Sequence, residues 1–405
     1  YYLKFLSDLG DGESPQQRAL IRPERDNIRL AWERAASSGM LEGLEQTAGI
    51  LHSFFSVQSW FQEGIDLFQR IMDILVENQY SNMEGLLCDL LGRKARMHTQ
   101  IGQLEKARAD SQQALTYLKH MDDSTRQSRI LDSLAITSYY GGDYQQATIL
   151  AEQSLKLSEQ TSNLDGVAFS LNFLGSCAKV QGNLDQCQGY FERAVSAYRS
   201  NKDEIGAAMV LNNLGNLLQV QEDFKSAQTY YLQSSEIFKT QDHVHGAATT
   251  LANAGKLAGK LGDYKLAGDL LQESLVLKRK INDQRGEAVS LAGLGDVAML
   301  TNNLEEARQY FRTSLEMAIL AGDIQLVLDI LAAVALLLAS KANTEISRHL
   351  ISYVLGHTGT SEEARQRLVR SQTETGMQVN EENLWQAEQV EDITEKILSM
   401  LLSVA

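Results

Sequence analysis

The chain has 405 residues, a formal net charge of −15 and a pI near 5.0, which disfavours nonspecific attraction to phosphate backbones or anionic lipid. Its apolar content of 43% and its two prolines favour continuous helix over disorder. The longest apolar run, residues 330–339, is ten residues long, well short of the roughly 18 that a membrane-spanning helix needs. We therefore expect no direct nucleic-acid partner and no membrane partner.

Three scattered cysteines, Cys88, Cys177 and Cys187, are typical of a protein kept reduced in the cytoplasm. No histidine or second cysteine lies at the spacing of a metal site, so we expect no metal and no cofactor in this chain. His243 and His245 fall in an expected loop between repeats, and we interpret them as a solvated pair rather than as ligands.

The first 44 residues have the pattern of a helical junction. A short helix over residues 1–9 is followed by a polar loop rich in Gly, Ser and Pro. Apolar residues at helical spacing, among them Trp32, predict an amphipathic helix over residues 24–35 that ends at Gly39.

The middle of the chain, residues 45–357, repeats at a step of 40 residues. The repeat pattern consists of four markers in the same order. The first is a glycine that follows Leu or Ala, and the second is a turn of the Gly-Asp kind. The third is a small residue, and the fourth is a pair of aromatic or aliphatic residues. They occur at Leu174-Gly175, Leu214-Gly215, Ala254-Gly255 and Leu294-Gly295; at Gly142-Asp143, Gly182-Asn183 and Gly262-Asp263; at Ala147, Cys187, Ala227, Ala267 and Ala307; and at Tyr190-Phe191, Tyr230-Tyr231, Leu270-Leu271 and Tyr310-Phe311. Such periodicity indicates stacked repeats, none of which can bury its apolar faces alone.

Each repeat is expected to be a pair of helices joined by the Gly-Asp turn, where a residue with positive φ is tolerated. The small residues Gly215 and Ala227 let the two backbones approach closely, and Tyr231 then fills the neighbouring groove. We therefore interpret the aromatic stripe as core packing.

This pattern resembles the tetratricopeptide repeat (TPR), which has small residues at its eighth, twentieth and twenty-seventh positions and a large apolar residue at its twenty-fourth. Here those positions hold Gly175, Cys187, Ala194 and Phe191. The resemblance implies an all-α fold, a right-handed α-solenoid of about eight helical hairpins. The period is 40 residues rather than the usual 34 or so, which predicts longer helices.

The repeat markers stop after residue 357. Two helices, over residues 361–375 and 381–402, are expected to form a C-terminal cap within residues 358–405, because repeat arrays need a polar end for solubility. Trp385 is expected to anchor this cap.

The N-terminal junction carries a second resemblance. The segment Arg-Asp-Asn-Ile-Arg-Leu-Ala-Trp, which ends at Trp32, and the segment that begins Trp-Phe-Gln-Glu-Gly at Trp60 look like the junction of signal-transduction ATPases of the STAND class. In those proteins a nucleotide-binding module and a winged-helix region precede a C-terminal TPR array. The resemblance covers residues 1–75 and implies that this chain, which starts at Tyr1 without a methionine, is a fragment of a larger bacterial regulator.

The sequence contains no convincing catalytic motif. A lookalike of the phosphate-binding loop over residues 255–260 lacks both the four-residue gap between its glycines and the Ser or Thr after Lys, and it falls within an expected helix. Metalloprotease and nucleophile-elbow motifs do not occur. We therefore expect no enzymatic activity in this chain.

The first helix of each repeat lines the concave face in the TPR family, with fixed positions that point at the ligand. Carried over to this sequence, and extended to its basic and polar centre, this predicts a peptide- or protein-binding set. The set is Arg129, Asn172, Lys179, Asn212, Asn216, Lys256 and Lys260. Its basic residues favour an acidic peptide or a C-terminal carboxylate. The asparagines could clamp a peptide backbone, or they could tie adjacent helices together.

We hypothesise that the chain is the ligand-sensing, protein-interaction solenoid of a STAND-type regulator. By resemblance, ligand capture would relieve autoinhibition of the ATPase and permit oligomerisation of the full-length protein. Two alternatives stay open. One is a stand-alone scaffold of the partner-of-inscuteable kind, whose 40-residue units carry motifs like Leu214-Gly215-Asn216, and the other is a receptor for short peptide pheromones.

Overall fold

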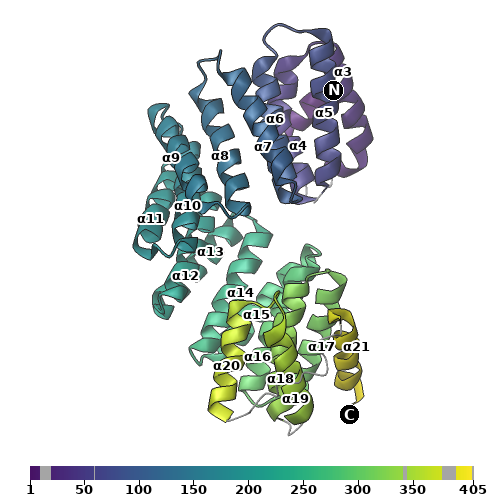
Figure 1. The fold of residues 1–405 in the computed structure, drawn as a ribbon, viewed down its shortest axis with the longest axis vertical. Coiled ribbons are helices and arrows are strands. Elements are labelled where there is room, and N and C mark those ends of the chain that lie inside the picture. Colours follow the sequence, from purple (N-terminus) through teal and green to yellow (C-terminus); the bar gives the residue numbers. More distant parts are fainter. Residues whose placement is uncertain (10–19, 59, 341–343, 376–388, 404–405) are drawn as a thin grey trace. The chain divides into compact units, whose positions relative to one another are not determined.

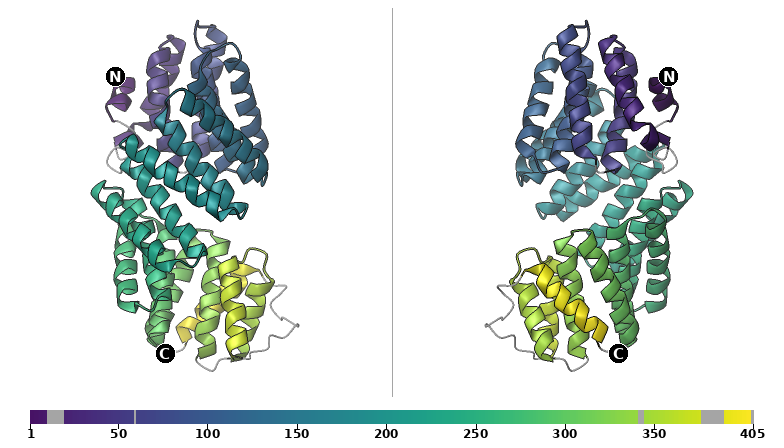
Figure 2. Two further views of the ribbon diagram at one scale, coloured as in Figure 1. Left: turned by 90° about the vertical axis from the view of Figure 1, so that its left-hand side faces the viewer. Right: turned by 90° about the vertical axis from the view of Figure 1, so that its right-hand side faces the viewer.

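The protein is built of helices connected by short turns, and no strand occurs in the part that the structure, a computed structural model, describes. The described residues are 1–9, 20–58, 60–340, 344–375 and 389–403. The chain divides into two compact units, Tyr1–Leu217 and Leu218–Ala405, and each has its own hydrophobic core. Figures 1 and 2 show the helices of neighbouring hairpins running side by side within each unit.

Unit 1 starts with a helical junction that leads into a series of hairpins. Its junction comprises α1 (Tyr2–Asp8), the 3-10 turn η1 (Arg22–Glu24) and α3 (Arg25–Ser37). Its hairpins are α4 (Leu41–Val57) with α5 (Phe61–Asn78), α6 (Glu84–Gln100) with α7 (Leu104–Leu118), α8 (Ser124–Tyr140) with α9 (Tyr144–Gln160), and α10 (Leu164–Val180) with α11 (Leu184–Ser200). Helix α12 (Glu204–Val220) contains the boundary between the units.

Unit 2 continues the same alternation and ends in two further helices. Its hairpin helices are α13 (Phe224–Thr240), α14 (Val244–Lys260), α15 (Tyr264–Lys280), α16 (Gln284–Leu300), α17 (Leu304–Leu320), α18 (Ile324–Ser340) and α19 (Thr344–Gly356), and the last two helices are α20 (Glu362–Thr375) and α21 (Val390–Ser403).

The 40-residue period has a simple geometric origin. Helices α10 and α11 are each 17 residues long, and residues 181–183 connect them. Two such helices and two three-residue turns account for the 40 residues. The prediction of longer helices is therefore confirmed, and the extra length is about one helical turn per hairpin half.

The turns repeat the same backbone conformation at each helix end. Gly142, Gly182 and Gly262 have φ angles of 81°, 78° and 84°, as the sequence predicts for a left-handed residue after a helix. At the corresponding position Lys202 and Glu222 adopt φ angles of 60° and 62° without being glycine. In these two turns the left-handed backbone conformation therefore costs conformational free energy, because the residue has a side chain.

Small residues of the first helix face the large apolar residue of the second, as predicted. A Cβ atom added to Gly175 would lie 2.5 Å from Cδ1 of Phe191, and one added to Gly295 would lie 2.6 Å from Cε1 of Phe311. Both phenylalanines are buried. Only glycine fits opposite these rings, which explains why the two markers recur together.

The small residue at the twenty-seventh repeat position contributes more than its size. Where it is serine, the hydroxyl is buried and bonds to the first helix of the same hairpin. Oγ of Ser274 donates to the carbonyl oxygen of Ala248 at 2.7 Å, and Oγ of Ser314 donates to that of Ala288 at 2.7 Å. This polar link between the two helices is not apparent from the repeat pattern.

The two junction segments that resemble the STAND proteins contact each other in unit 1. The Trp32 ring is buried, with its centroid 6.0 Å from that of Phe68. The Arg25 guanidinium lies 5.2 Å from the centroid of the Trp60 ring and 3.4 Å from the carboxylate of Glu63. The conspicuous residues of both segments therefore form one packed cluster.

The C-terminal helices differ in where they lie. Helix α21 packs against α17 and α18 (Figure 1). Nη1 of Arg308 on α17 donates to the carbonyl oxygen of Leu401 at 3.0 Å. Helix α20 packs against α18 and α19, the last hairpin, and its polar side chains also bond to first helices of earlier hairpins. Trp385, the expected anchor, lies outside the described residues.

Candidate functional site

The first helices of consecutive hairpins contact one another and form a continuous row, which we call the inner row of each unit. In unit 1 this row includes α4, α6, α8 and α10, and in unit 2 it includes α14, α16 and α18. The predicted site residues all lie on first helices: Arg129 on α8, Asn172 and Lys179 on α10, Asn212 and Asn216 on α12, and Lys256 and Lys260 on α14.

A cavity of about 240 Å³ opens on the inner row of unit 1, between α6, α8 and the start of α10. Arg93 and Arg96 from α6 and Arg129 from α8 line it; we call these three residues the arginine cluster. Nε of Arg96 donates to Oγ of Ser133 at 3.1 Å, and its guanidinium lies 5.5 Å from the centroid of the Phe169 ring. The cavity is therefore lined by three arginines, by the Phe169 ring and by the carboxylates of Asp89, Asp132 and Asp165.

Asp89, Asp132 and Asp165 share the cavity with the arginine cluster, but none of these three carboxylates forms a close ion pair with it. Among the residues that the structure describes, none of its three members forms an ion pair, and the buried Nε of Arg93 has no hydrogen-bond partner. Arg126, on the same face, is by contrast bonded to Glu45, Asp89 and Asp123. Arg93 and Arg96 are half-buried and Arg129 is exposed, so guanidinium groups without a close ion pair are within reach of an anion.

The ionisation of neighbouring groups reflects this concentration of positive charge. Burial, which Asp89 partly offsets, together with the nearby Arg96 lowers the pKa of Arg93 to about 10. Burial and the charges of Arg96 and Arg93 lower the pKa of His52 to about 3, so His52 is neutral near pH 7.

Asp132 is the acidic group most deeply set in this region. Burial raises the pKa of its carboxyl to about 6, although hydrogen bonds from Ser154 and Ser170 and the charge of Arg96 act in the opposite direction. Oγ of Ser170 donates to Oδ1 of Asp132 at 3.2 Å. Asp132 therefore changes charge close to physiological pH, beside the arginine cluster.

The structure places the predicted residues of unit 1 in different surroundings. Arg129 lines the cavity, whereas Asn172 and Lys179 do not. Oδ1 of Asn172 accepts a hydrogen bond from Nδ2 of Asn213 at 3.0 Å, which joins α10 to α12 and favours a tie between helices for this amide. Asn212 and Asn216 are half-buried on α12.

Arg93 and Arg96 were not in the predicted set, although Arg96 occupies a ligand-facing repeat position. The sequence does carry a signal for them. Arg93 and Arg96 are three residues apart on one first helix, and Arg126 and Arg129 are three apart on the next, so each pair shares a helix face. Arginines on the same face of adjacent stacked helices come together.

A larger groove, about 1900 Å³ in volume, runs along the inner row of unit 2. Both predicted lysines of this unit, Lys256 and Lys260, line it, together with residues of α16, α18 and α20. Nζ of Lys260 lies 2.7 Å from Oε1 of Glu363 on α20. In this unit a predicted binding residue is therefore already engaged by the chain's own helix.

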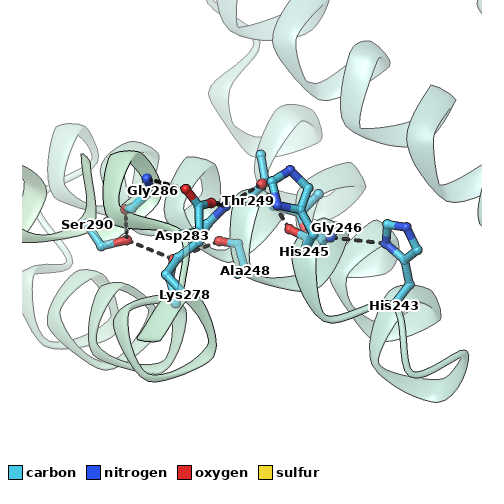
Figure 3. Close-up of polar contacts among 11 residues, drawn as sticks. His243, His245, Gly246, Ala248, Thr249, Lys278, Asp283, Gly286 and Ser290 are labelled. Carbon is cyan, nitrogen blue, oxygen red and sulfur yellow. Dashed lines mark hydrogen bonds and ion pairs between the residues drawn. The ribbon is translucent and has the colours of Figure 1, made fainter. Parts of the chain in front are cut away.

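His243 lies in the turn before α14 and His245 is exposed, as expected, but His245 belongs to the helix and both rings have polar partners (Figure 3). His243 is the N-cap of α14: its Nδ1 accepts from the backbone N–H of Gly246 at 3.1 Å, and its ring stacks on Phe238 at a centroid distance of 5.0 Å. Nδ1 of His245 lies 3.6 Å from Oδ2 of Asp283. His243 thus does the work that Asn or Asp does at other helix starts.

The same close-up shows a buried lysine that holds three helices together (Figure 3). Nζ of Lys278 lies 2.8 Å from Oδ2 of Asp283 and 3.0 Å from Oγ1 of Thr249, and Oδ1 of Asp283 accepts from the N–H of Gly286 at 2.8 Å. Burial acts to raise the pKa of Asp283, but the bonds from Lys278 and Gly286 outweigh it and the pKa is lowered. These contacts are structural links between α14, α15 and α16.

The described part of the chain also shows whether it holds a metal site, a reactive cysteine or a membrane-spanning helix. It contains no group of three His, Cys, Asp or Glu side chains that could hold a metal ion. Cys88, Cys177 and Cys187 are free and buried, and burial raises the pKa of Cys187 to about 11 despite the nearby Lys179. None of the helices in the described ranges is long and apolar enough to cross a membrane.

Comparison with known proteins agrees with the repeat architecture. The tetratricopeptide repeat family matches residues 166–240 and 246–319. No curated protein matches the sequence.

Solved structures with this fold include a STAND protein with a tetratricopeptide repeat sensor from Pyrococcus horikoshii, at 14% identity and a TM-score of 0.62 over 98% of this chain and 54% of that one. Aspartyl phosphate phosphatase F from Bacillus subtilis is similar at 15% identity and a TM-score of 0.56, over 90% of this chain and 92% of that one. A Rap protein complexed with competence and sporulation factor is similar at 12% identity and a TM-score of 0.52, over 93% and 97%.

Residues 166–240 and 246–319 are therefore tetratricopeptide repeats, and the chain is an all-α solenoid of such hairpins whose fold resembles that of the STAND protein with its repeat sensor. The chain spans about half the length of that STAND protein. Arrays of this class are generally noncatalytic scaffolds that bind peptide or protein partners in sensor and adaptor roles.

Proposed function

We propose that this chain is the sensing and protein-interaction part of a larger STAND-type regulator, and that it binds an acidic segment of a peptide or protein on the inner row of unit 1. The observation that carries the proposal is the arginine cluster: three guanidinium groups around a cavity of about 240 Å³ that have no ion-pair partner in the described residues. A carboxylate is the complementary group, because it accepts two N–H donors from one guanidinium.

The roles of individual residues follow from their positions. Arg129, the exposed member of the cluster, would make the first contact with the ligand carboxylate, and Arg96 would hold it at the cavity floor. Phe169 offers an apolar surface to the ligand's side chain. Asp89, Asp132 and Asp165 also line the cavity, and their negative charge would reduce the affinity for the ligand carboxylate.

The junction packing supports the STAND context. The cluster around Trp32 and Trp60 consists of the residues that resemble the STAND junction, and similar architecture occurs in a solved STAND protein. In such a regulator the ligand-bound array would relieve autoinhibition and permit oligomerisation. This role needs no cofactor and no catalytic residue in this chain.

The test is a binding titration with a fluorescein-labelled hexaglutamate peptide as the probe. Arg129→Ala and Arg96→Ala are each expected to weaken binding by about tenfold, the value of one charge-assisted hydrogen bond. Arg108→Ala is the matched control, because Arg108 is exposed on the second helix α7 and lies outside the cavity. Equal affinity of wild type and both cluster variants would contradict the assignment.

A second candidate is a stand-alone receptor for short peptides. It is supported by the similarity of the fold to that of a Rap protein solved in complex with competence and sporulation factor. The two candidates differ in size of ligand and in dependence on an ATPase. Probe binding that alters ATP hydrolysis by the full-length protein supports the STAND assignment, and absence of any such effect supports the receptor.

A further inference from the structure

Helix α20 belongs to unit 2 and packs against α18 and α19 (Figure 1). Its side chains and its N-cap residue also bond to α14, α16 and α18, the first helices of three hairpins. Glu363 pairs with Lys260 of α14 at 2.7 Å. Arg367 makes two bonds to Asp296 of α16, at 2.6 and 3.2 Å. Side chains of α20 thus reach first helices of the inner row of unit 2.

The start of α20 is fixed by a similar polar contact. Oγ of Ser361 donates to Oδ1 of Asp329 on α18 at 2.6 Å and accepts from the backbone N–H of Ala364 at 3.1 Å, which caps α20. One hydroxyl therefore both starts the helix and attaches it to the inner row.

The apolar anchorage of α20 is small. Ala364 and Leu368 are buried against unit 2, whereas Val369 on the next face is 51% exposed. The rest of the helix is polar, with the sequence EEARQRLVRSQTET. Arg365 adds two bonds, to the carbonyl oxygens of Leu355 and His357, at 2.6 Å each. A helix that is held mainly by polar bonds and buries few apolar side chains opens more readily than one whose whole face is buried.

The groove beside α20 is only partly filled. Its volume of about 1900 Å³ extends from the end of α12, past Lys256 and Lys260, to α18. The charge of Lys256 acts to lower the pKa of both Glu363 and Asp329, although Lys256 forms no ion pair with a residue of the described ranges. The α14 edge therefore presents two lysines to a single carboxylate of α20.

The charge pattern defines what the groove accepts. Burial acts to raise the pKa of Glu363, but Lys260, Lys256 and Arg367 outweigh it, so this carboxyl has a lowered pKa and is ionised. From one end to the other, the groove has a basic edge at α14 and acidic residues, Asp296 and Asp329, on α16 and α18. A matching helix carries a carboxylate, then a cation one turn later, then an apolar residue.

We propose that α20 is an internal occupant of this groove, and that the external partner of unit 2 is an amphipathic protein helix that replaces it. The partner helix places a carboxylate against Lys256 and Lys260, an arginine or lysine four residues later against Asp296, and leucine at the position of Leu368. This rests on the proposed protein-interaction function and adds a second, helical ligand to the acidic segment bound in unit 1.

The experiment uses the full chain and a labelled synthetic peptide of residues 361–375 as the probe. In wild type the tethered α20 competes at high effective concentration, so the peptide binds weakly. Arg367→Glu with Leu368→Ala releases α20 and leaves the groove intact, and we expect it to bind the wild-type peptide at least about tenfold more tightly. Val369→Ala is the matched control and leaves the affinity unchanged.

Two further measurements make the result decisive. Lys256→Glu with Lys260→Glu, added to the release variant, is expected to abolish binding of the probe. Hydrogen exchange of wild type is expected to show faster exchange in α20 than in α18. Equal probe affinity of wild type and the release variant, or α20 amides as protected as those of α18, would overturn the proposal and make α20 a fixed structural element.

The milder variant Arg367→Gln serves if the double substitution impairs folding, and its helical content is checked by circular dichroism. Failure here is distinguishable from failure of the proposed function. Arg129→Ala, in unit 1, tests hexaglutamate binding and is expected to leave binding of the α20 peptide unchanged. Either site can therefore fail while the other stands.

Discussion

The inner rows of the two units share one backbone pattern and differ in how their charges are neutralised. In unit 1 the arginine cluster surrounds a small cavity and has no ion-pair partner among the described residues. In unit 2 Lys260 and Asp296 are paired with Glu363 and Arg367 of the chain's own α20. The comparison indicates that repeat geometry creates the surface, whereas the charges placed on it decide whether it is free or occupied.

The largest expected effect concerns the packing that the two units share. Phe191→Ala in unit 1 and Phe311→Ala in unit 2 each remove a buried ring that fills the space opposite a glycine. Each is expected to lower the free energy of unfolding by about 3–5 kcal/mol. Denaturant titration measures the loss, with Leu232→Ala as a control at a position that is 37% exposed. A loss in only one unit would show that the core packing is not equivalent.

Adding a methyl group should distinguish tight from open glycines within unit 1. Gly175→Ala places a Cβ 2.5 Å from the Phe191 ring, so we expect a destabilisation of about 1–3 kcal/mol. Gly189→Ala meets no atom within 4 Å and should stabilise α11 by about 0.5–1 kcal/mol through helix propensity. Thermal unfolding of both variants is the measurement. If the two variants changed the melting temperature in the same direction, the close contact between residue 175 and the Phe191 ring would not determine the stability change.

A pH dependence should appear in unit 1. Because Asp132 has a raised pKa of about 6, it is largely ionised at pH 7 and largely protonated at pH 5. The loss of this negative charge should tighten binding of the hexaglutamate probe by about fivefold, since the probe's carboxylates, with a pKa near 4.3, stay ionised. Asp132→Asn should bind as tightly at pH 7 as wild type does at pH 5. A pH profile that survives this substitution would assign the effect to another group.

The same carboxyl gives a stability effect of known sign. Its folded pKa lies above its unfolded value near 3.9, so the folded state binds the proton more tightly. This contribution to stability is present below about pH 4 and is lost as the pH rises through about 6. Asp132→Asn should remove that decline, as followed by urea titration between pH 4 and 7.

The smallest expected effect concerns the turns. Glu222 in unit 2 has a φ of 62°, where a side chain is disfavoured, so Glu222→Gly should stabilise the protein by about 0.5–1 kcal/mol. Gly182 in unit 1 has a φ of 78°, and Gly182→Ala should destabilise by about 1 kcal/mol. Melting temperatures suffice to measure both. Effects of the same sign would mean that contacts of the side chain, and not backbone conformation, dominate these turns.

Only those residues of the candidate sites that follow from the repeat pattern or from the charge pattern could be predicted from the sequence. The ligand-facing positions of the family located Arg129 and Lys256, and the basic and polar centre of the sequence added Lys260; all three line a cavity or groove. They did not reveal Arg93, because it lies one helical step away from those positions. They also could not distinguish an amide that binds a ligand from one that ties helices, as Asn172 does with Asn213.

The sequence alone determined the all-α solenoid, the 40-residue period and the pairing of small with aromatic residues, as at Gly175 and Phe191. These features depend on local helix periodicity and on turns a few residues long, so they can be predicted from neighbours in the chain. Only the tertiary structure decided that His243 caps a helix, that three arginines share one cavity, and that α20 fills a groove. Charge compensation depends on residues that are far apart in sequence and meet only when the helices stack, and no local pattern specifies those meetings.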